Sequence, residues 1–388
     1  MRPPFDFDVV VVGAGVVGLA IGYASARRGA AVAILEKESG IGQGVSSRHS
    51  GVIHAGLYYP TGSLRASLCV EGRRGLYPFL RSHGVAHEKC GKLIVATDES
   101  EIARLEAVAR QARRNGVEGL EWLTGDEARA LEPELFAVAA LLSTETGIVD
   151  SHGYMLALLA EVETRGGVLA ARTPFLSAQP VAGGGFAVQT GGENPTTVFA
   201  EKLIIAAGLG AQKAAAAIGG YRTEEIPPPQ LGKGVYFRIS GRAPFERLVY
   251  PLPIPGALGT HYGRDLGGQA RFGPDLQFVD TESYDVDPAR AERFYRDIRR
   301  YWPRLPDGAL EPDYAGIRPK IHAAGETQPD FRIDGAQMHG LPGLVALFGM
   351  ESPGLTCSLA IGETVTGMLE GPRVSRSAAA VDPGGKAR

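Results

Sequence analysis

The chain has 388 residues, of which 44% are hydrophobic and 21% are charged, and its formal net charge is −3. This composition is ordinary for a globular protein, and the length predicts two domains. The weak acidic excess gives no basic field for nucleic acid, and three widely spaced cysteines, Cys69, Cys90 and Cys357, exclude a disulfide framework and a cysteine metal site. We therefore expect a cytoplasmic protein without a metal ion or a nucleic-acid partner.

The N-terminal segment predicts one β-α-β unit of the α/β class. DVVVVGAG (residues 8–15) is β-branched without alternation, which is typical of a buried parallel strand. VVGLAIGYASARRG then predicts a helix of small residues that ends at Gly29, and AAVAILEKE predicts a second buried strand.

Three more helices are predicted in the first half of the chain. They cover residues 63–82, 98–116 and 151–166, and the last two have clear caps at Asp98 and Ser151. No run approaches the roughly 20 uninterrupted apolar residues that a membrane-spanning helix needs. We therefore expect no transmembrane segment.

The second half of the chain is richer in strands. VLAAR, FAVQTG and TTVFAEKLIIAAG, within residues 168–207, predict a β-meander, and residues 226–286 alternate further strands with glycine and proline turns, one of them PIPGALG. PARAERFYRDIRRYWP (residues 288–303) predicts a helix, and the chain closes with a strand, a glycine turn and a helix. Residues 372–388 lack apolar periodicity and predict a flexible tail.

A dinucleotide-binding fingerprint lies between the first strand and the first helix. Gly13, Gly15 and Gly18 form G-x-G-x-x-G, and Glu36 ends the second strand. The glycines let the backbone approach a pyrophosphate at the helix N-terminus, and the carboxylate suits the hydroxyls of an adenosine ribose. The pattern fits either NAD or FAD. FAD is favoured because no second nucleotide fingerprint is present, and because the C-terminal helix that begins near Gly354 suits the negative charge of a reduced flavin.

The run SSRHSGVIHAGLYYP (residues 46–60) follows the fingerprint by ten residues and combines cationic, hydroxyl and imidazole groups with glycines. We expect residues 46–49 to lie along the cofactor and residues 54–59 to face the substrate. A solvated polar loop is the alternative interpretation.

Several segments together resemble the D-amino-acid-oxidase-like superfamily of FAD oxidoreductases, and within it the L-2-hydroxyglutarate dehydrogenase/oxidase subfamily. They are HSGVIHAGLYYPTGSLRASLCVEG, CGKLIV, TGIVD, AAGL and SPGLTCSLAI. The middle of the chain departs from this pattern: GKGVYF stands where the resemblance leads us to expect Arg-Gly near residues 232–236. The identity of the 2-hydroxy acid therefore stays open.

The resemblance implies a Rossmann-like FAD-binding domain with a β-meander, interleaved with a mixed-sheet substrate domain. The FAD domain would use residues 1–85, 143–225 and 325–371, and the substrate domain residues 86–142 and 226–324. The implied cofactor, which we expect to be noncovalent FAD, would contact Gly13, Gly15, Val16, Val17, Gly18, Glu36, Lys37, Ser46, Ser47, Arg48, His49, Ser50, Phe175, Ala207, Gly208, Gly349, Glu351, Ser352, Pro353, Gly354, Leu355 and Thr356.

Oxidation of a 2-hydroxy acid needs a cation for the carboxylate and a base for the hydroxyl proton. Arg318, in AGIRPK, resembles the carboxylate-binding arginine of the superfamily, and its planar guanidinium suits bidentate binding. His261 and His54 compete as the base, with His261 favoured. The further candidates for contacts with the substrate are Tyr58, Tyr59, Tyr236 and Tyr250. Lys233 is interpreted as an exposed lysine, with a pairing to a distal carboxylate as the alternative.

The main hypothesis is thus an FAD-dependent enzyme that oxidises a small 2-hydroxy acid, resembling L-2-hydroxyglutarate, to the 2-oxo acid by hydride transfer to the flavin. The alternatives are an amine or amino-acid oxidase of the glycine or sarcosine type, and a flavoprotein without catalytic activity. The electron acceptor stays open between oxygen, a quinone and a carrier protein. A quinone would require peripheral contact with the inner membrane face, for which the arginine-rich helix at residues 288–303 is the one modest candidate.

Overall fold

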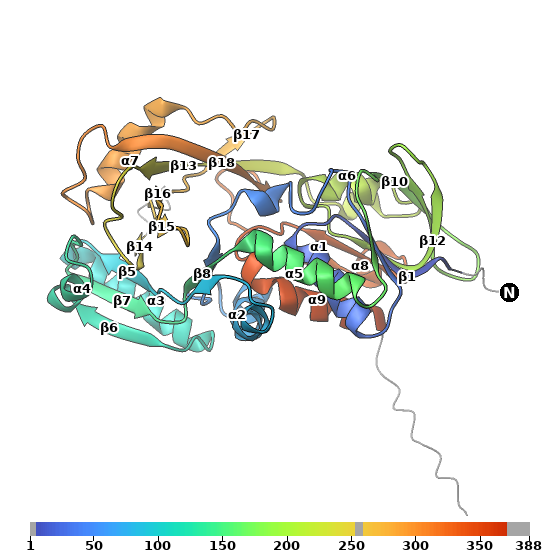
Figure 1. Ribbon diagram of the computed structural model, residues 1–388, viewed down its shortest axis with the longest axis horizontal. Helices are drawn as coiled ribbons and strands as arrows, with labels where there is room; N and C mark the ends of the chain where they lie inside the picture. The colour runs from blue at the N-terminus through green and yellow to red at the C-terminus, as the bar shows by residue number, and fades with distance from the viewer. Residues whose placement is uncertain (1–4, 253–258, 371–388) are drawn as a thin grey trace, which may run out of the picture.

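The computed structural model describes residues 5–252 and 259–370 as a mixed α/β fold with three β-sheets (Figure 1). The predicted tail, residues 372–388, and most of the predicted turn PIPGALG lie outside these residues. Among the described residues, no helix combines the length and the apolar character that a bilayer crossing requires.

The first sheet has a parallel centre that contains the predicted β-α-β unit. β1 pairs in parallel with β2 on one side and with β12 on the other, and β20 and β9 extend the parallel pairing. Alternate residues of β1 point to opposite faces, so Val9 and Val11 pack in one core cluster and Val10 and Val12 in another. The bounds are β1 (Phe7–Val12), β2 (Val32–Leu35), β9 (Val168–Ala170), β12 (Thr197–Ile205), β19 (Arg332–Asp334) and β20 (Leu344–Phe348).

Helices cover both faces of this sheet. α1, α2, α5 and α9 pack together on one face (Figure 1), and the short α6 and α8 complete this part of the fold. The predicted helices at residues 16–29, 63–82 and 151–166 are present with small differences at their ends. The predicted cap of the third helix was wrong: Asp150, not Ser151, caps it, because its carboxylate accepts a hydrogen bond from the amide of Gly153. The bounds are α1 (Val16–Arg27), α2 (Leu64–Ser82), α5 (Ser151–Glu163), α6 (Ala211–Ala216), α8 (Ala336–His339) and α9 (Gly354–Glu370).

The predicted β-meander is present, but its first strand was wrongly placed. VLAAR contributes β9, which pairs in parallel with β2 because α5 returns the chain to that edge of the sheet. The antiparallel meander instead consists of β10 (Phe175–Pro180), β11 (Phe186–Thr190) and the first half of β12. A three-residue strand carries too little pattern to distinguish the two arrangements.

The second sheet is mixed and has nine strands drawn from two distant parts of the chain, residues 92–143 and 230–320. Its only parallel pair among the described residues joins β14 to β5, and this pair connects the two parts. β18 pairs along almost the whole length of β13. The bounds are β5 (Lys92–Ala96), β6 (Leu120–Thr124), β7 (Ala139–Ser143), β13 (Gln230–Ile239), β14 (Leu248–Pro251), β15 (Tyr262–Arg264), β16 (Ala270–Phe272), β17 (Gln277–Val279) and β18 (Leu310–Lys320).

Three helices lie beside the second sheet (Figure 1): α3 (Ile102–Arg114), α4 (Gly125–Leu131) and α7 (Ala291–Ile298). α7 is shorter than the predicted helix at residues 288–303, because the chain leaves the helix after Ile298 as it approaches Pro303. A small third sheet joins β3 (Val52–Ile53), β8 (Gly147–Val149) and β4 (His87–Glu88). β3 lies in the middle of the run at residues 46–60, called the histidine-rich run below because it contains His49 and His54.

Candidate active site between the two large sheets

A cavity of about 1550 Å³ lies at the carboxyl ends of the parallel strands, with residues of the second sheet forming its opposite wall. Val12, Leu35 and Ala206, at or directly after the ends of β1, β2 and β12, line it. Open α/β sheets bind their ligands at this edge. The volume exceeds the roughly 300–1,000 Å³ of most small-molecule sites, so the cavity can hold a dinucleotide together with a small substrate.

The glycine fingerprint lets the backbone turn tightly at this edge. Gly13 has a φ of +107°, and a Cβ there would lie 2.6 Å from the carbonyl oxygen of Ala206. A Cβ at Gly18 would overlap the carbonyl oxygen of Gly13, so α1 packs directly on the turn. Gly15 begins α1 without a side-chain cap of its own. The N-terminus of α1 therefore faces the cavity with its backbone close to any ligand.

Ser46, 30 residues further along the chain, caps the N-terminus of α1. The amide of Val16 donates a hydrogen bond to Ser46 Oγ at 3.1 Å, and both residues line the cavity. The hydroxyl hydrogen of Ser46 is left to donate toward an anion placed at the end of α1. The neighbouring Ser47 does not line the cavity, and its hydroxyl donates instead to the carbonyl oxygen of Gly44 at 2.8 Å.

Glu36 stands at the end of β2 and is almost completely buried. Its carboxylate accepts hydrogen bonds from the amides of Ala14 at 2.8 Å and Glu38 at 2.9 Å, and it lines the cavity. These bonds fix the glycine turn relative to β2 and hold the carboxylate where a ribose hydroxyl would donate to it.

The C-terminal loop before α9 approaches the histidine-rich run. Thr356 Oγ1, in the first turn of α9, accepts a hydrogen bond from the amide of His54 at 3.0 Å, and the Ser352 hydroxyl lies 3.3 Å from His54 Nε2. Ser352, Gly354 and Leu355 line the cavity. The positive end of α9 thus faces the same space as the end of α1.

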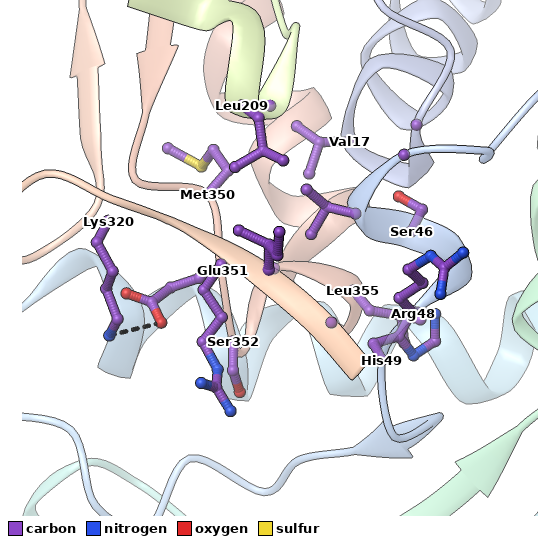
Figure 2. Close-up of a pocket in the computed structure, with 18 of the residues that line it drawn as sticks. Val17, Ser46, Arg48, His49, Leu209, Lys320, Met350, Glu351, Ser352 and Leu355 are labelled. Atoms are coloured by element: carbon purple, nitrogen blue, oxygen red, sulfur yellow. Dashed lines mark ion pairs between the residues drawn. The ribbon is translucent and has the colours of Figure 1, made fainter. Parts of the chain in front are cut away.

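These features fit FAD. Two helix N-termini face the cavity, one beside a pyrophosphate-type glycine turn and the other where it suits an electron-rich flavin ring. Most of the predicted cofactor residues line this cavity, and Figure 2 shows Ser46, Arg48 and His49 on one side of it. The predicted cofactor residues that do not line it are Gly18, Ser47, Gly349 and Thr356.

The opposite wall combines residues of the second sheet with the loop at residues 54–59, and it holds all the predicted substrate residues. Arg318 lies in β18 opposite Gly232 of β13, and its Nη1 donates to the carbonyl oxygen of Asp275 at 3.3 Å. Arg318 forms no ion pair with any residue in the described parts of the chain. The predicted residues of this wall that line the cavity are Tyr58, Tyr59, Tyr236, Tyr250, His54, His261 and Arg318.

Both candidate bases line the cavity, in different surroundings. The His261 imidazole is stacked on the Tyr250 ring, with 3.7 Å between ring centroids. His54 is half-buried and opens onto the cavity. Burial, followed by the charge of Lys92, holds the pKa of His54 well below its usual range. His54 is therefore neutral at neutral pH and able to accept a proton.

His49 also lines the cavity, and burial lowers its pKa to about 4. Its Nδ1 accepts a hydrogen bond from the amide of Gly51 at 2.9 Å, and its carbonyl oxygen accepts one from the hydroxyl of Tyr314. These contacts fix the loop between the cofactor side and the substrate wall.

The sequence interpretation missed a buried ion cluster in the cavity wall. Glu351 pairs with Lys320 at 2.9 Å and with Arg65 at 3.3 Å, and Gln328 donates to the same carboxylate at 2.9 Å. Figure 2 shows the pair of Lys320 and Glu351 across the cavity from Ser46 and Arg48. No local pattern indicates this cluster, because its members are far apart in the sequence.

The interpretation of Lys233 as an exposed lysine was wrong. Its side chain is buried, with Nζ 3.4 Å from Ser283 Oγ, and it does not line the cavity. Within residues 5–252 and 259–370, no group of three or more His, Cys, Asp or Glu side chains is arranged to hold a metal ion.

A family model described as FAD dependent oxidoreductase matches residues 8–368. The chain belongs to this family. It is 41% identical to L-2-hydroxyglutarate dehydrogenase, mitochondrial, of Arabidopsis thaliana, over 92% of this chain and 82% of that protein. It is 29% identical to L-2-hydroxyglutarate dehydrogenase of Escherichia coli K12, over 96% of this chain and 95% of that protein.

Solved structures of the same fold agree with this assignment. L-alpha-glycerophosphate oxidase from Mycoplasma pneumoniae with FAD bound superimposes with a TM-score of 0.83 at 26% identity, over 94% of both chains. Glycine oxidase from Geobacillus kaustophilus, at 23% identity, shares the fold with a TM-score of 0.78, over 97% of this chain and 98% of that chain. The predictions of the family, of the fold class, of FAD and of an oxidoreductase are confirmed.

Proposed function

We propose that this protein oxidises a 2-hydroxy acid of the 2-hydroxyglutarate class to the 2-oxo acid, with FAD in the cavity. The observation that carries the proposal is the position of Arg318, whose guanidinium has no carboxylate partner among the described residues. It lines the same cavity as the neutral His54 and the two helix N-termini that suit FAD. The names of the relatives support a hydroxy acid over the amine and amino-acid alternatives.

Each residue of the wall has a role in this proposal. Arg318 binds the carboxylate through paired N–H donors and so fixes the direction of the neighbouring carbon. His54 accepts the hydroxyl proton, because it is neutral and adjoins the loop before α9 through Ser352. His261, stacked on Tyr250, is the second candidate for this step. FAD held in the cavity would supply the hydride acceptor for the carbon that carries the hydroxyl.

We assign noncovalent FAD to the domain formed by residues 1–85, 143–225 and 325–371, and the substrate domain to residues 86–142 and 226–324. The two large sheets support this division, because their strands come mainly from these two sets of segments. The low pKa of His49 reflects its burial, and its Nδ1 already accepts a hydrogen bond from the chain. We assign it to positioning the loop rather than to a covalent bond.

We further propose a cytoplasmic location. Cys69, Cys90 and Cys357 are all free thiols, which supports a reducing compartment. The alternative of peripheral membrane contact through residues 288–303 has less support, because four arginines there have carboxylate partners within the protein. The pairs are Arg290 with Asp275, Arg293 with Asp297, Arg299 with Asp307 and Arg300 with Glu101.

Anaerobic mixing of the FAD-loaded protein with a panel of substrates tests the function. We expect L-2-hydroxyglutarate to bleach the visible flavin absorbance, and glycine, sarcosine and other amino acids to leave it unchanged. Bleaching by amino acids alone, or by no member of the panel, would overturn the proposal. Re-oxidation of the reduced protein by oxygen, by a soluble quinone or only by a carrier protein then assigns the acceptor.

A further inference from the structure

Three lysines of the described chain are buried, and they differ in what compensates their charge. Lys320 is 4% exposed and pairs with Glu351, and Lys233 is 8% exposed and lies near the Ser283 hydroxyl. Lys92, at the start of β5, is only 1% exposed, and within the described residues it has no hydrogen bond or ion pair to a carboxylate, amide or hydroxyl. Burying a cation in this way is costly, so its retention calls for a functional reason.

The contacts of Lys92 are aromatic rings of the substrate wall. Its Nζ lies over the Tyr250 ring, 4.5 Å from the centroid, and over the Tyr58 ring at 5.3 Å. Tyr250 in turn carries the stacked His261 imidazole. Lys92 therefore lies directly behind the wall that faces the substrate, although it does not itself line the cavity.

The same ammonium lies close enough to His54 to act on its charge. The charged and titratable groups that act on His54 are Lys92, His261 and His49, each of which disfavours a positive imidazole. The polar groups that contact it are Ser352 at its ring, and Thr356 and the Cys69 thiol at its backbone. Burial lowers the pKa of Lys92 to about 8, so its side chain is mainly cationic at neutral pH.

We propose that Lys92 is a positioning residue of the oxidation: from behind the substrate wall, its buried ammonium holds the Tyr58 and Tyr250 rings in place and supplies a positive charge that acts on the His54 imidazole. The inference rests on the proposed function for its catalytic meaning. Through Lys92, β5 would then influence the charge of the base and the positions of the rings around it. A neutral imidazole is what the removal of a hydroxyl proton requires.

Loss of the Lys92 charge is expected to raise the pKa of His54. Removing the ammonium takes away a repulsion, so the pKa of His54 rises toward its ordinary value of about 6.5. The base is then protonated at a higher pH, and the acidic limb of flavin reduction moves upward by roughly one pH unit. Burial lowers the pKa of Lys92 itself to about 8, so the comparison is made below pH 8, where Lys92 is charged.

The test uses the FAD-loaded protein and the variants Lys92→Met and Lys92→Arg. Lys92→Met keeps the length of the side chain without its charge, and it should fold at least as stably as the wild type. Lys92→Arg should leave the acidic limb where it is. The matched control is Lys89→Met: Lys89 Nζ also lies 5.3 Å from a tyrosine ring, that of Tyr77, but it is exposed and pairs with Glu145.

Two measurements are made on each protein: the rate of anaerobic flavin reduction by L-2-hydroxyglutarate against pH, and the titration of His54 by histidine-selective NMR, assigned with His54→Gln. We expect both to move upward in Lys92→Met and neither to move in Lys89→Met. A wild-type His54 that titrates at or above pH 6.5 would overturn the inference, even if Lys92→Met failed to fold. So would a Lys92→Met protein with an unmoved limb.

The NMR titration does not depend on turnover. If the hydroxy acid does not reduce the wild-type flavin, the proposed function fails, whereas the coupling between Lys92 and His54 is still measured. The two failures are therefore distinguishable.

Discussion

The two walls of the cavity are built in different ways. On the cofactor side, the backbone itself approaches the ligand. The Gly13 turn, the N-terminus of α1 and the N-terminus of α9 each lie within a short, continuous segment of the chain. On the substrate side, side chains converge from β14, β18 and the histidine-rich run, which are far apart in the sequence. The first wall depends on the absence of side chains, and the second depends on particular ones.

This difference predicts two separate classes of variant. A change on the cofactor side should remove FAD and, with it, all activity, because a ligand cannot bind where the backbone has been displaced. A change on the substrate side should leave the flavin bound and slow its reduction. A cofactor-side variant that keeps FAD but is reduced slowly, or a substrate-side variant that loses FAD, would contradict this separation.

The broadest effect is expected for Gly18→Ala, because the loss of FAD would remove all activity. The added Cβ would overlap the Gly13 carbonyl oxygen, which belongs to the turn and has no space to retreat. Overpacking of roughly 1–3 kcal/mol or more at this turn should weaken FAD binding by about 10- to 100-fold and leave the purified protein largely colourless. The control is Gly367→Ala in α9, where a Cβ meets nothing within 4 Å. A yellow, active Gly18→Ala protein would contradict the assigned role of the backbone.

The largest effect among variants that keep FAD is expected for the base. His54→Gln should keep FAD but lower the rate of flavin reduction by about 10²–10⁴-fold, because glutamine cannot accept the hydroxyl proton. His261→Gln should have a smaller effect through the packing of Tyr250. Rapid mixing of each variant with the hydroxy acid measures both rates. The reverse order of effects would transfer the role of base to His261, and loss of FAD from both variants would break the separation of the two walls.

Arg318→Met should follow, with kcat/KM lowered by roughly 10²-fold and FAD retained, because the substrate carboxylate loses its charged partner. Arg318→Lys should mainly raise KM, since a lysine keeps the charge without the planar pair of donors. Arg238→Met serves as the control, because Arg238 lies in the adjacent strand β13 but is exposed and pairs with Glu311 at the surface. Unchanged kinetics in Arg318→Met would exclude Arg318 from the site.

The same contrast explains how much the sequence could predict. The strand, glycine turn and helix of residues 7–27 carry their pattern locally, so the β-α-β unit and its ligand class follow from periodicity and the fingerprint. The substrate residues came instead from the resemblance to a family. Periodicity could not have placed Arg318 in the same cavity as His54, because the position of Arg318 depends on how β18 is registered against β13.

The features that the sequence did not predict are electrostatic contacts between residues far apart in the chain. Lys92 stands in CGKLIV, a segment that reads as one more buried strand, and its position behind Tyr250 arises only from the parallel pairing of β5 with β14. The ion cluster at Glu351 likewise joins α2, β18 and the loop before α9. A lysine inside an otherwise apolar strand is the one local signal that could have indicated a buried charge.

The smallest predicted effect separates two adjacent serines and is the finest test of the comparison. Ser46 Oγ accepts a hydrogen bond from the amide of Val16 at the N-terminus of α1. The Ser47 hydroxyl instead donates a hydrogen bond to the loop backbone outside the cavity. Ser46→Ala should therefore weaken FAD binding by about 3- to 10-fold, the equivalent of one hydrogen bond of roughly 1 kcal/mol, and Ser47→Ala should not. Fluorescence titration of the apoprotein with FAD measures both constants. Equal losses in the two variants would show that the loop acts through its shape as a whole, and the direct contact of Ser46 with the cofactor would have to be abandoned.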